Sequence, residues 1–108
     1  MRIQYLILSF FTLFNSCNAA SQSELKEVGR YILEIDEPSG ITTDGSYLYI
    51  VSDQNGKVFK TNFKGEILGT FDSEKKDLEG IAYNPINDEF AIISEEKREI
   101  YIFGRGGV

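Results

Sequence analysis

The sequence of 108 residues contains no histidine, no tryptophan and a single cysteine. Without histidine, the chain cannot build a Ser-His-Asp or Cys-His catalytic site or a histidine-ligated zinc site. The one cysteine, Cys17, cannot form a disulfide within its own chain. These absences exclude many hydrolases and metalloenzymes, and they leave packing as the source of stability.

Positive charge is also scarce, with 11 Lys and Arg against 17 Asp and Glu and a formal net charge of −6. The basic residues form no cluster, since Lys75-Lys76 and Lys97-Arg98 are isolated pairs among acids. An acidic chain of this kind repels phosphate backbones. We therefore expect no nucleic-acid partner and favour cations or basic partners.

The longest apolar run, YLILSFFTLF, covers residues 5–14 and is preceded by Arg2. It is too short to span a bilayer as a helix, and its small uncharged continuation is typical of a secretory signal. The sequence therefore predicts a targeting segment over residues 1–20. Arg2 is the only charged residue there, so the exported part keeps 10 basic and 17 acidic side chains.

Cys17 leaves two routes of processing open. The run LFNSC at residues 13–17 resembles a bacterial lipobox, in which the cysteine is acylated and becomes the mature N-terminus. Cleavage after Ala19 or Ala20 would instead discard it. The first route predicts a lipoprotein anchored to the plasma or outer membrane of the cell envelope through Cys17, and the second predicts a periplasmic protein.

Residues 21–30 show no sustained apolar period and are expected to form a polar tether. From Tyr31 onward the chain consists of short β-type runs separated by turn residues, without a helical period. Tight turns are expected at Asn55-Gly56 and Lys64-Gly65. The predicted fold is all-β, built of antiparallel meanders, with strands over residues 31–35, 41–43, 47–52, 57–63 and 66–71.

The β-type pattern repeats along the chain. Residues 38–42 (PSGIT) align with residues 78–82 (LEGIA) at an offset of 40, and residues 49–53 (YIVSD) align with residues 91–95 (AIISE) at an offset of 42. A recurrence of about 40 to 45 residues carrying four short strands is the spacing of a β-propeller blade. A plain antiparallel sandwich is the alternative.

A propeller has typically four to eight blades, whereas residues 31–108 supply about two. We interpret residues 31–108 as a partial β-propeller, the N-terminal piece of a longer one. The rival interpretation is that several copies assemble into one ring.

Four motifs resemble those of the SdiA-regulated (YjiK-type) family of bacterial envelope β-propellers. They are EPSG at residues 37–40, LYIVSD at 48–53, GEILG at 65–69 and DLEG at 77–80, and the resemblance spans about residues 31–103. It implies a propeller longer than this chain, a membrane or periplasmic location, and no settled biochemical activity.

Acidic residues recur with the repeat, because Glu37 aligns with Asp77 and Asp53 aligns with Glu95. Residues that enter the innermost strand of each blade are expected to face the channel mouth. Carboxylates that converge there suit a hard cation, so Glu37, Asp77 and Glu79 are predicted as Ca²⁺ ligands. The alternative is that such acids accept backbone N–H groups at strand ends, which we favour for Asp53 and Glu95.

Two functions fit this pattern. The first is a non-enzymatic binding or scaffold module without catalytic residues, whose partner is an unidentified ligand or envelope protein. The second is a calcium-dependent phosphoesterase that resembles the propeller phytases and uses a metal-bound water as nucleophile.

Overall fold

The computed structural model describes residues 23–105 and contains seven β-strands, with no α-helix in that part of the chain. Cys17 and the whole predicted targeting segment, residues 1–20, lie outside the described residues, whereas residues 23–30 of the predicted tether are described, exposed and without helix or strand. The chain divides into two units, Met1–Arg30 and Tyr31–Val108, and all the strands belong to the second. No helix among the described residues is long and apolar enough to cross a membrane.

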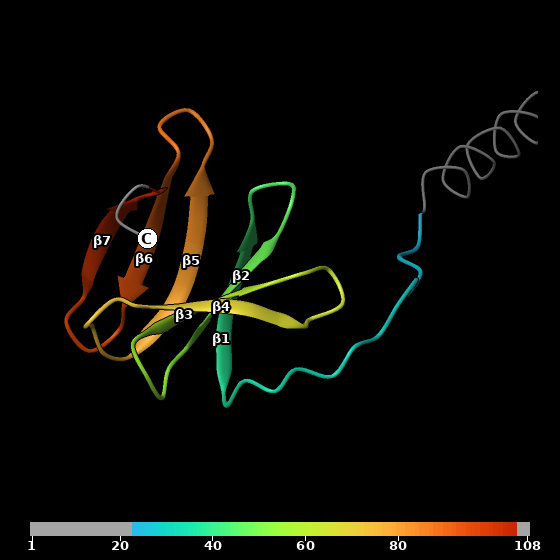
Figure 1. Ribbon diagram of the computed structural model, residues 1–108, viewed down its shortest axis with the longest axis horizontal. Coiled ribbons are helices and arrows are strands. Elements are labelled where there is room, and N and C mark those ends of the chain that lie inside the picture. The colour runs from blue at the N-terminus through green and yellow to red at the C-terminus, as the bar shows by residue number, and fades with distance from the viewer. Residues whose placement is uncertain (1–22, 106–108) are drawn as a thin grey trace, which may run out of the picture. The chain divides into compact units, whose positions relative to one another are not determined.

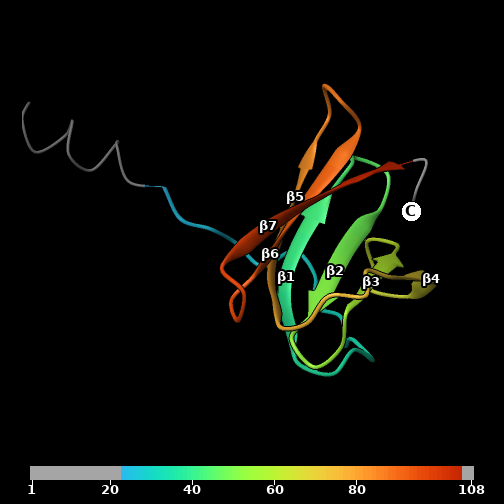
Figure 2. The ribbon, with the colours of Figure 1, turned by 90° about the vertical axis from the view of Figure 1, so that its left-hand side faces the viewer.

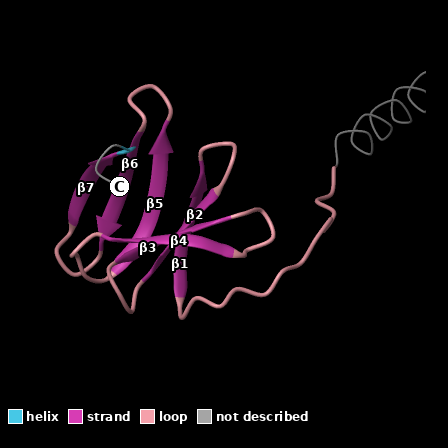
Figure 3. Cartoon of the chain, in the orientation of Figure 1, coloured by secondary structure: helices cyan, strands magenta, loops and turns pink. Residues whose placement is uncertain are grey.

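The strands form two antiparallel sheets in which neighbours in sequence are neighbours in space (Figures 1 and 3). The all-β prediction is therefore confirmed, although residues 23–105 do not close a propeller. The first sheet contains β1 (Pro38–Thr43), β2 (Leu48–Ser52), β3 (Lys57–Thr61) and β4 (Ile67–Asp72), and the second contains β5 (Leu78–Asn84), β6 (Glu89–Ser94) and β7 (Glu99–Gly104).

The core lies between the two sheets. Side chains alternate between the two faces of a strand, so Tyr49 and Val51 of β2 point to the same side. They pack with Phe90 and Ile92 of β6, and the rings of Tyr49 and Phe90 are 4.6 Å apart. This apolar contact, completed by Val58 and Leu78, is the main source of stability.

The segment 31–35 does not form the strand that the sequence predicts. It lies instead against the face of the first sheet that points away from the second sheet, where Leu33 lines a hollow with Ile41 and Ile50. Ile35 is only 6% exposed. The segment is fixed at its end because Ser52 Oγ donates a hydrogen bond of 2.6 Å to the carbonyl of Asp36.

The two sheets repeat each other in detail. Both first strands carry an irregularity of register, between Pro38 and Gly40 in β1 and between Leu78 and Gly80 in β5. Figure 2 shows β1 and β5 close to each other. The same two hydrogen bonds recur beside each irregularity: Ser52 Oγ to Asp36 O and Asp53 N to Glu37 O in the first sheet, and Ser94 Oγ to Lys76 O and Glu95 N to Asp77 O in the second.

Candidate functional site

Three carboxylates from the two sheets meet at one end of the strands. Asp53 follows β2, Asp77 precedes β5, and Glu79 lies within β5. One oxygen from each lies within 4.8 Å of the other two, and all three residues are half-buried. We call Asp53, Asp77 and Glu79 the acidic cluster.

The carboxylate of Asp53 is the least satisfied group in the cluster. Its Oδ1 is buried and accepts no hydrogen bond from any described residue. A buried carboxylate oxygen without a donor is costly, because it has lost its hydration without a replacement. A cation beside Asp53 would therefore supply the electrostatic partner that the described residues do not give to this oxygen.

Glu37 borders the cluster. A hydrogen bond with the Asp53 side chain raises the pKa of Glu37 above its ordinary value, and the negative charge of Asp53 raises it further. The backbone of Glu37 is left-handed, with φ of 44°, and Asp77 at the equivalent position of the second sheet has φ of 56°. Few non-glycine residues adopt this conformation, so the chain turns sharply into β1 and β5 in the same way.

Burial raises the pKa of Glu79, and the charges of Glu95, Asp77 and Asp53 raise it further. The negative field at this end of the sheets therefore includes Glu95, which extends the cluster toward the turn after β6. The raised pKa values of Glu37 and Glu79 indicate an excess of negative charge at this site, which the described residues around it do not neutralise.

The sequence predicted Glu37, Asp77 and Glu79 as ligands, and the structure brings Asp77 and Glu79 together with Asp53. Glu37 adjoins this group through Asp53. We expected Asp53 to accept backbone N–H groups at a strand end, and this prediction is wrong for its Oδ1. The hydroxyl of the preceding Ser52 occupies that role, since it donates to Asp36 O and accepts from Gln54 N.

An open hollow of about 610 Å³ lies beside the acidic cluster. Asp53 and Asp77 line it together with the two basic residues Lys75 and Lys76. The hollow gives a hydrated ion direct access to two of the three carboxylates. Glu74 and Glu96 also line the hollow, so four acidic side chains stand there against two lysines.

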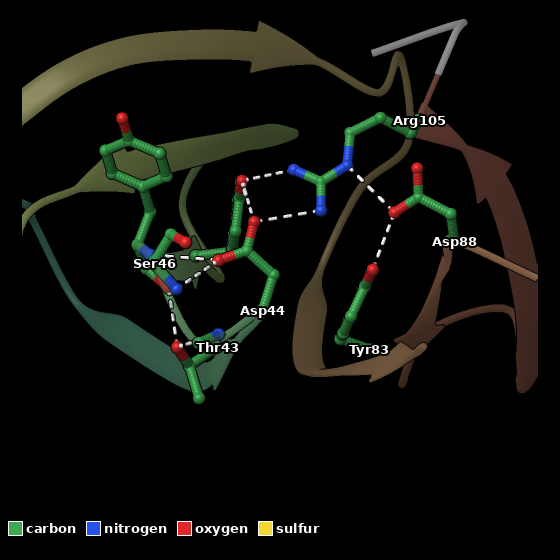
Figure 4. Close-up of polar contacts among 9 residues, drawn as sticks. Thr43, Asp44, Ser46, Tyr83, Asp88 and Arg105 are labelled. Carbon is green, nitrogen blue, oxygen red and sulfur yellow. Dashed lines mark hydrogen bonds and ion pairs between the residues drawn. The ribbon is translucent and has the colours of Figure 1, made fainter. Parts of the chain in front are cut away.

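At the opposite end of the strands, Arg105 joins the two sheets (Figure 4). Its guanidinium donates to Asp44 Oδ2 at 2.9 Å and to Asp88 Oδ1 at 3.1 Å, so it bridges the β1–β2 and β5–β6 loops. Tyr49 and Tyr83 donate to the same two carboxylates, and the oxygen of Tyr49 also accepts from Arg105. We call these five residues the Arg105 network.

The carboxylate of Asp44 has a pKa well below its ordinary value. Burial opposes its ionisation, but hydrogen bonds from the backbone N–H groups of Ser46 and Tyr47, and then from Arg105, outweigh the burial. Both carboxylates of the network pair with the one guanidinium of Arg105, and each also accepts a hydrogen bond from a tyrosine hydroxyl. The Arg105 network is therefore a structural link between the sheets, in contrast to the uncompensated acidic cluster.

Sequence reasoning missed both the place of Asp53 in the acidic cluster and the link made by Arg105. A signal for Arg105 exists, because the β1–β2 and β5–β6 loops each carry an aspartate with a tyrosine five positions away, Asp44 with Tyr49 and Asp88 with Tyr83. If these two pairs face each other, a positively charged side chain between them would offset the negative charge of the aspartates. Arg105 is the described basic residue that supplies it.

Comparisons with known proteins add no relative: no family model, no curated protein and no solved structure matches this chain.

Proposed function

We propose that this chain is an exported, membrane-associated binding module with β-propeller-type blades, and that its acidic cluster binds a divalent cation such as Ca²⁺. One observation carries the proposal. Asp53, whose Oδ1 is buried and unpartnered, contributes an oxygen within 4.8 Å of one oxygen each from Asp77 and Glu79.

The spacing of these oxygens suits a hard cation. Ca²⁺ binds carboxylate oxygens at about 2.3 to 2.6 Å, so two oxygens on the same ion lie at most roughly 5 Å apart. Ca²⁺ takes six to eight oxygens, and water from the adjoining open hollow would complete the shell. A bound cation would also neutralise the charge that raises the pKa of Glu79.

The remaining parts of the proposal are supported by sequence patterns. The apolar run at residues 5–14 supports export, and the lipobox-like residues 13–17 support an anchor at Cys17. The EPSG and DLEG motifs support membership of the SdiA-regulated family. The matching hydrogen bonds beside β1 and β5 support the interpretation of each sheet as a blade.

Calorimetric titration of Ca²⁺ into the full chain tests the cation site. We expect one saturable binding event, weakened at least tenfold by Asp53→Asn and by Glu79→Gln. The matched control is Glu34→Gln, which removes the same charge from an exposed side chain outside the cluster and should leave the affinity unchanged. No binding at millimolar Ca²⁺, or equal weakening by all three variants, would rule out the acidic cluster as the site.

A calcium-dependent phosphoesterase is the second candidate function, and one feature of the hollow favours it. Lys75 and Lys76 stand beside Asp53 and Asp77, so a phosphate could contact a basic group and a cation together. Hydrolysis of p-nitrophenyl phosphate by the full chain with Ca²⁺ tests this function. We expect no turnover above that of the Asp53→Asn variant, whereas calcium-dependent turnover lost in that variant would favour the enzyme.

A further inference from the structure

Asparagine side chains form the same local turn at three places in the described chain. In each, the side-chain Oδ1 accepts a hydrogen bond from the backbone N–H two residues further on: Lys57 N to Asn55 at 3.1 Å, Lys64 N to Asn62 at 2.9 Å, and Ile86 N to Asn84 at 3.0 Å. Such an Asx turn folds the side chain back over the peptide group that follows it. The turns differ in the next residue, which is glycine after Asn55, phenylalanine after Asn62 and proline after Asn84.

Gly56 has no side chain that would hold its backbone nitrogen away from the Cγ atom of Asn55. In the other two turns, the side chain of Phe63 crowds this approach, and Pro85 has no N–H at all. Among the described residues, the N–H of Gly56, which lies outside the strands, donates no backbone hydrogen bond. The nitrogen of Gly56 is therefore free to attack the neighbouring Asn55 side chain, and the attack is intramolecular.

The peptide group between Gly56 and Lys57 is held in the orientation that polarises the Asn55 side chain. The carbonyl of Gly56 accepts hydrogen bonds from Ser73 N at 2.7 Å and from Ser73 Oγ at 2.6 Å. The N–H of Lys57 points the opposite way in this trans peptide and donates to Asn55 Oδ1. A donor at this oxygen stabilises the negative charge that the oxygen gains when a nucleophile adds to Cγ.

Packing requires a glycine at position 56, so the Asn-Gly step is part of the fold. A Cβ atom on Gly56 would overlap the carbonyl oxygen of Lys75. Because that oxygen belongs to the backbone, no side chain can turn away to make room. The step is also open to water, since Asn55 is half-buried and lines the hollow beside the acidic cluster.

We propose that Asn55 is a modification site, at which the side chain deamidates spontaneously through attack by the backbone nitrogen of Gly56. The Gly56 nitrogen loses its proton to water and bonds to Asn55 Cγ, and the Asn55 side-chain nitrogen takes up a proton and leaves as ammonia. Water then opens the resulting cyclic imide at either of its carbonyl carbons, which gives an aspartyl or an isoaspartyl residue. The overall reaction consumes one water and releases one ammonia.

Deamidation changes the charge of the hollow beside the acidic cluster. A neutral amide becomes a carboxylate among Asp53, Asp77, Glu74 and Glu96, which line the same hollow. The change is irreversible in water, because the released ammonia diffuses away. It concerns residue 55 itself and does not depend on whether the acidic cluster binds Ca²⁺.

Peptide mapping by mass spectrometry tests the proposal on the full chain, incubated at neutral pH and sampled over several weeks. We expect replacement of NH₂ by OH at Asn55 at least about tenfold faster than at Asn62, which has the same turn and is also half-buried. The modified peptide should contain both the aspartyl and the isoaspartyl isomer, because the imide opens at either carbonyl. Asn55→Gln is the control, since its longer side chain would have to close a larger ring and should leave that peptide unchanged.

The same chain dissolved in urea gives the rate of the reaction without the fold. We expect the folded chain to react at Asn55 at no less than about one tenth of that rate, because the turn leaves the reacting atoms next to each other. A slower reaction in the folded chain would show that the turn protects Asn55 and would overturn the proposal. An aspartyl product alone, which direct hydrolysis by water gives, or equal rates at Asn55 and Asn62 would overturn it as well.

Discussion

Gly40 of β1 lies directly against Gly80 of β5, so closely that a Cβ atom on Gly40 would stand 2.8 Å from the Cα atom of Gly80. The two residues occupy equivalent places in the repeat, and this contact sets how near the first strands of the two sheets approach. Backbone meets backbone there, so no flexible side chain can move aside.

Gly40→Ala is therefore expected to destabilise the protein by about 1 to 3 kcal/mol, the usual cost of overpacking. The matched control is Gly69→Ala in β4, where a Cβ atom would meet nothing within 4 Å. Urea denaturation of both variants measures the difference. Equal stability of the two would contradict the close approach of β1 and β5.

Arg105→Ala tests the Arg105 network. The side chain of Asp44 is only 9% exposed and that of Arg105 is 35% exposed, so removal of Arg105 leaves a mostly buried carboxylate without its cation. We expect a loss of about 1 to 3 kcal/mol, less than for a fully buried pair because water reaches Arg105. Lys64→Ala removes an exposed positive charge and should change stability by less than about 0.5 kcal/mol. A similar effect of both variants in urea denaturation would show that the network contributes little.

Stability should fall in acid because the pKa of Asp44 is lowered on folding. Burial opposes this shift, while the N–H groups of Ser46 and Tyr47 and the guanidinium of Arg105 cause it. The stabilisation is fully present above the unfolded pKa of about 3.9 and is lost as the pH falls toward the lower folded value. Urea midpoints measured from neutral pH down to pH 3 should decline below about pH 4, and Asp44→Asn should decline less steeply. Urea midpoints that fall equally with pH in the unsubstituted protein and in Asp44→Asn would contradict the role of Asp44.

Calcium should stabilise the protein at neutral pH and lose its effect in acid. Folding raises the pKa of Glu37 mainly through Asp53, and that of Glu79 mainly through burial. Both contributions favour folding below the unfolded pKa of about 4.3 and are lost as the pH rises through the folded values, where charge repulsion appears. Ca²⁺ binds the ionised carboxylates and relieves that repulsion. The rise in melting temperature on adding Ca²⁺ should be larger at pH 7 than at pH 4, and the same rise at both would count against the site.

Sequence patterns predicted much of the fold because the repeat is local and strict. The turn glycines, the β-type runs and the recurrence of Gly40 at Gly80 led to the four-stranded meander and to its second, partial copy. The segment 31–35 was mistaken for a strand because its pattern is β-like, and a strand also requires a partner.

The candidate site was predicted only in part because it depends on how the two sheets meet. Asp77 and Glu79 belong to one motif and could be found together, whereas Asp53 comes from the other sheet. At a strand end, an aspartate that accepts backbone N–H groups and an aspartate left without a donor have the same sequence pattern. Arg105 was missed for a similar reason, since its partners are 61 and 17 residues away.

The most direct test of the cation site is to follow the side-chain carboxylate ¹³C resonances of the full chain by NMR while Ca²⁺ is added. The account predicts saturable shifts at Asp53, Asp77 and Glu79, with the resonance of Glu34 unchanged. Resonances of the acidic cluster that do not move, or that move no more than that of Glu34, would contradict it.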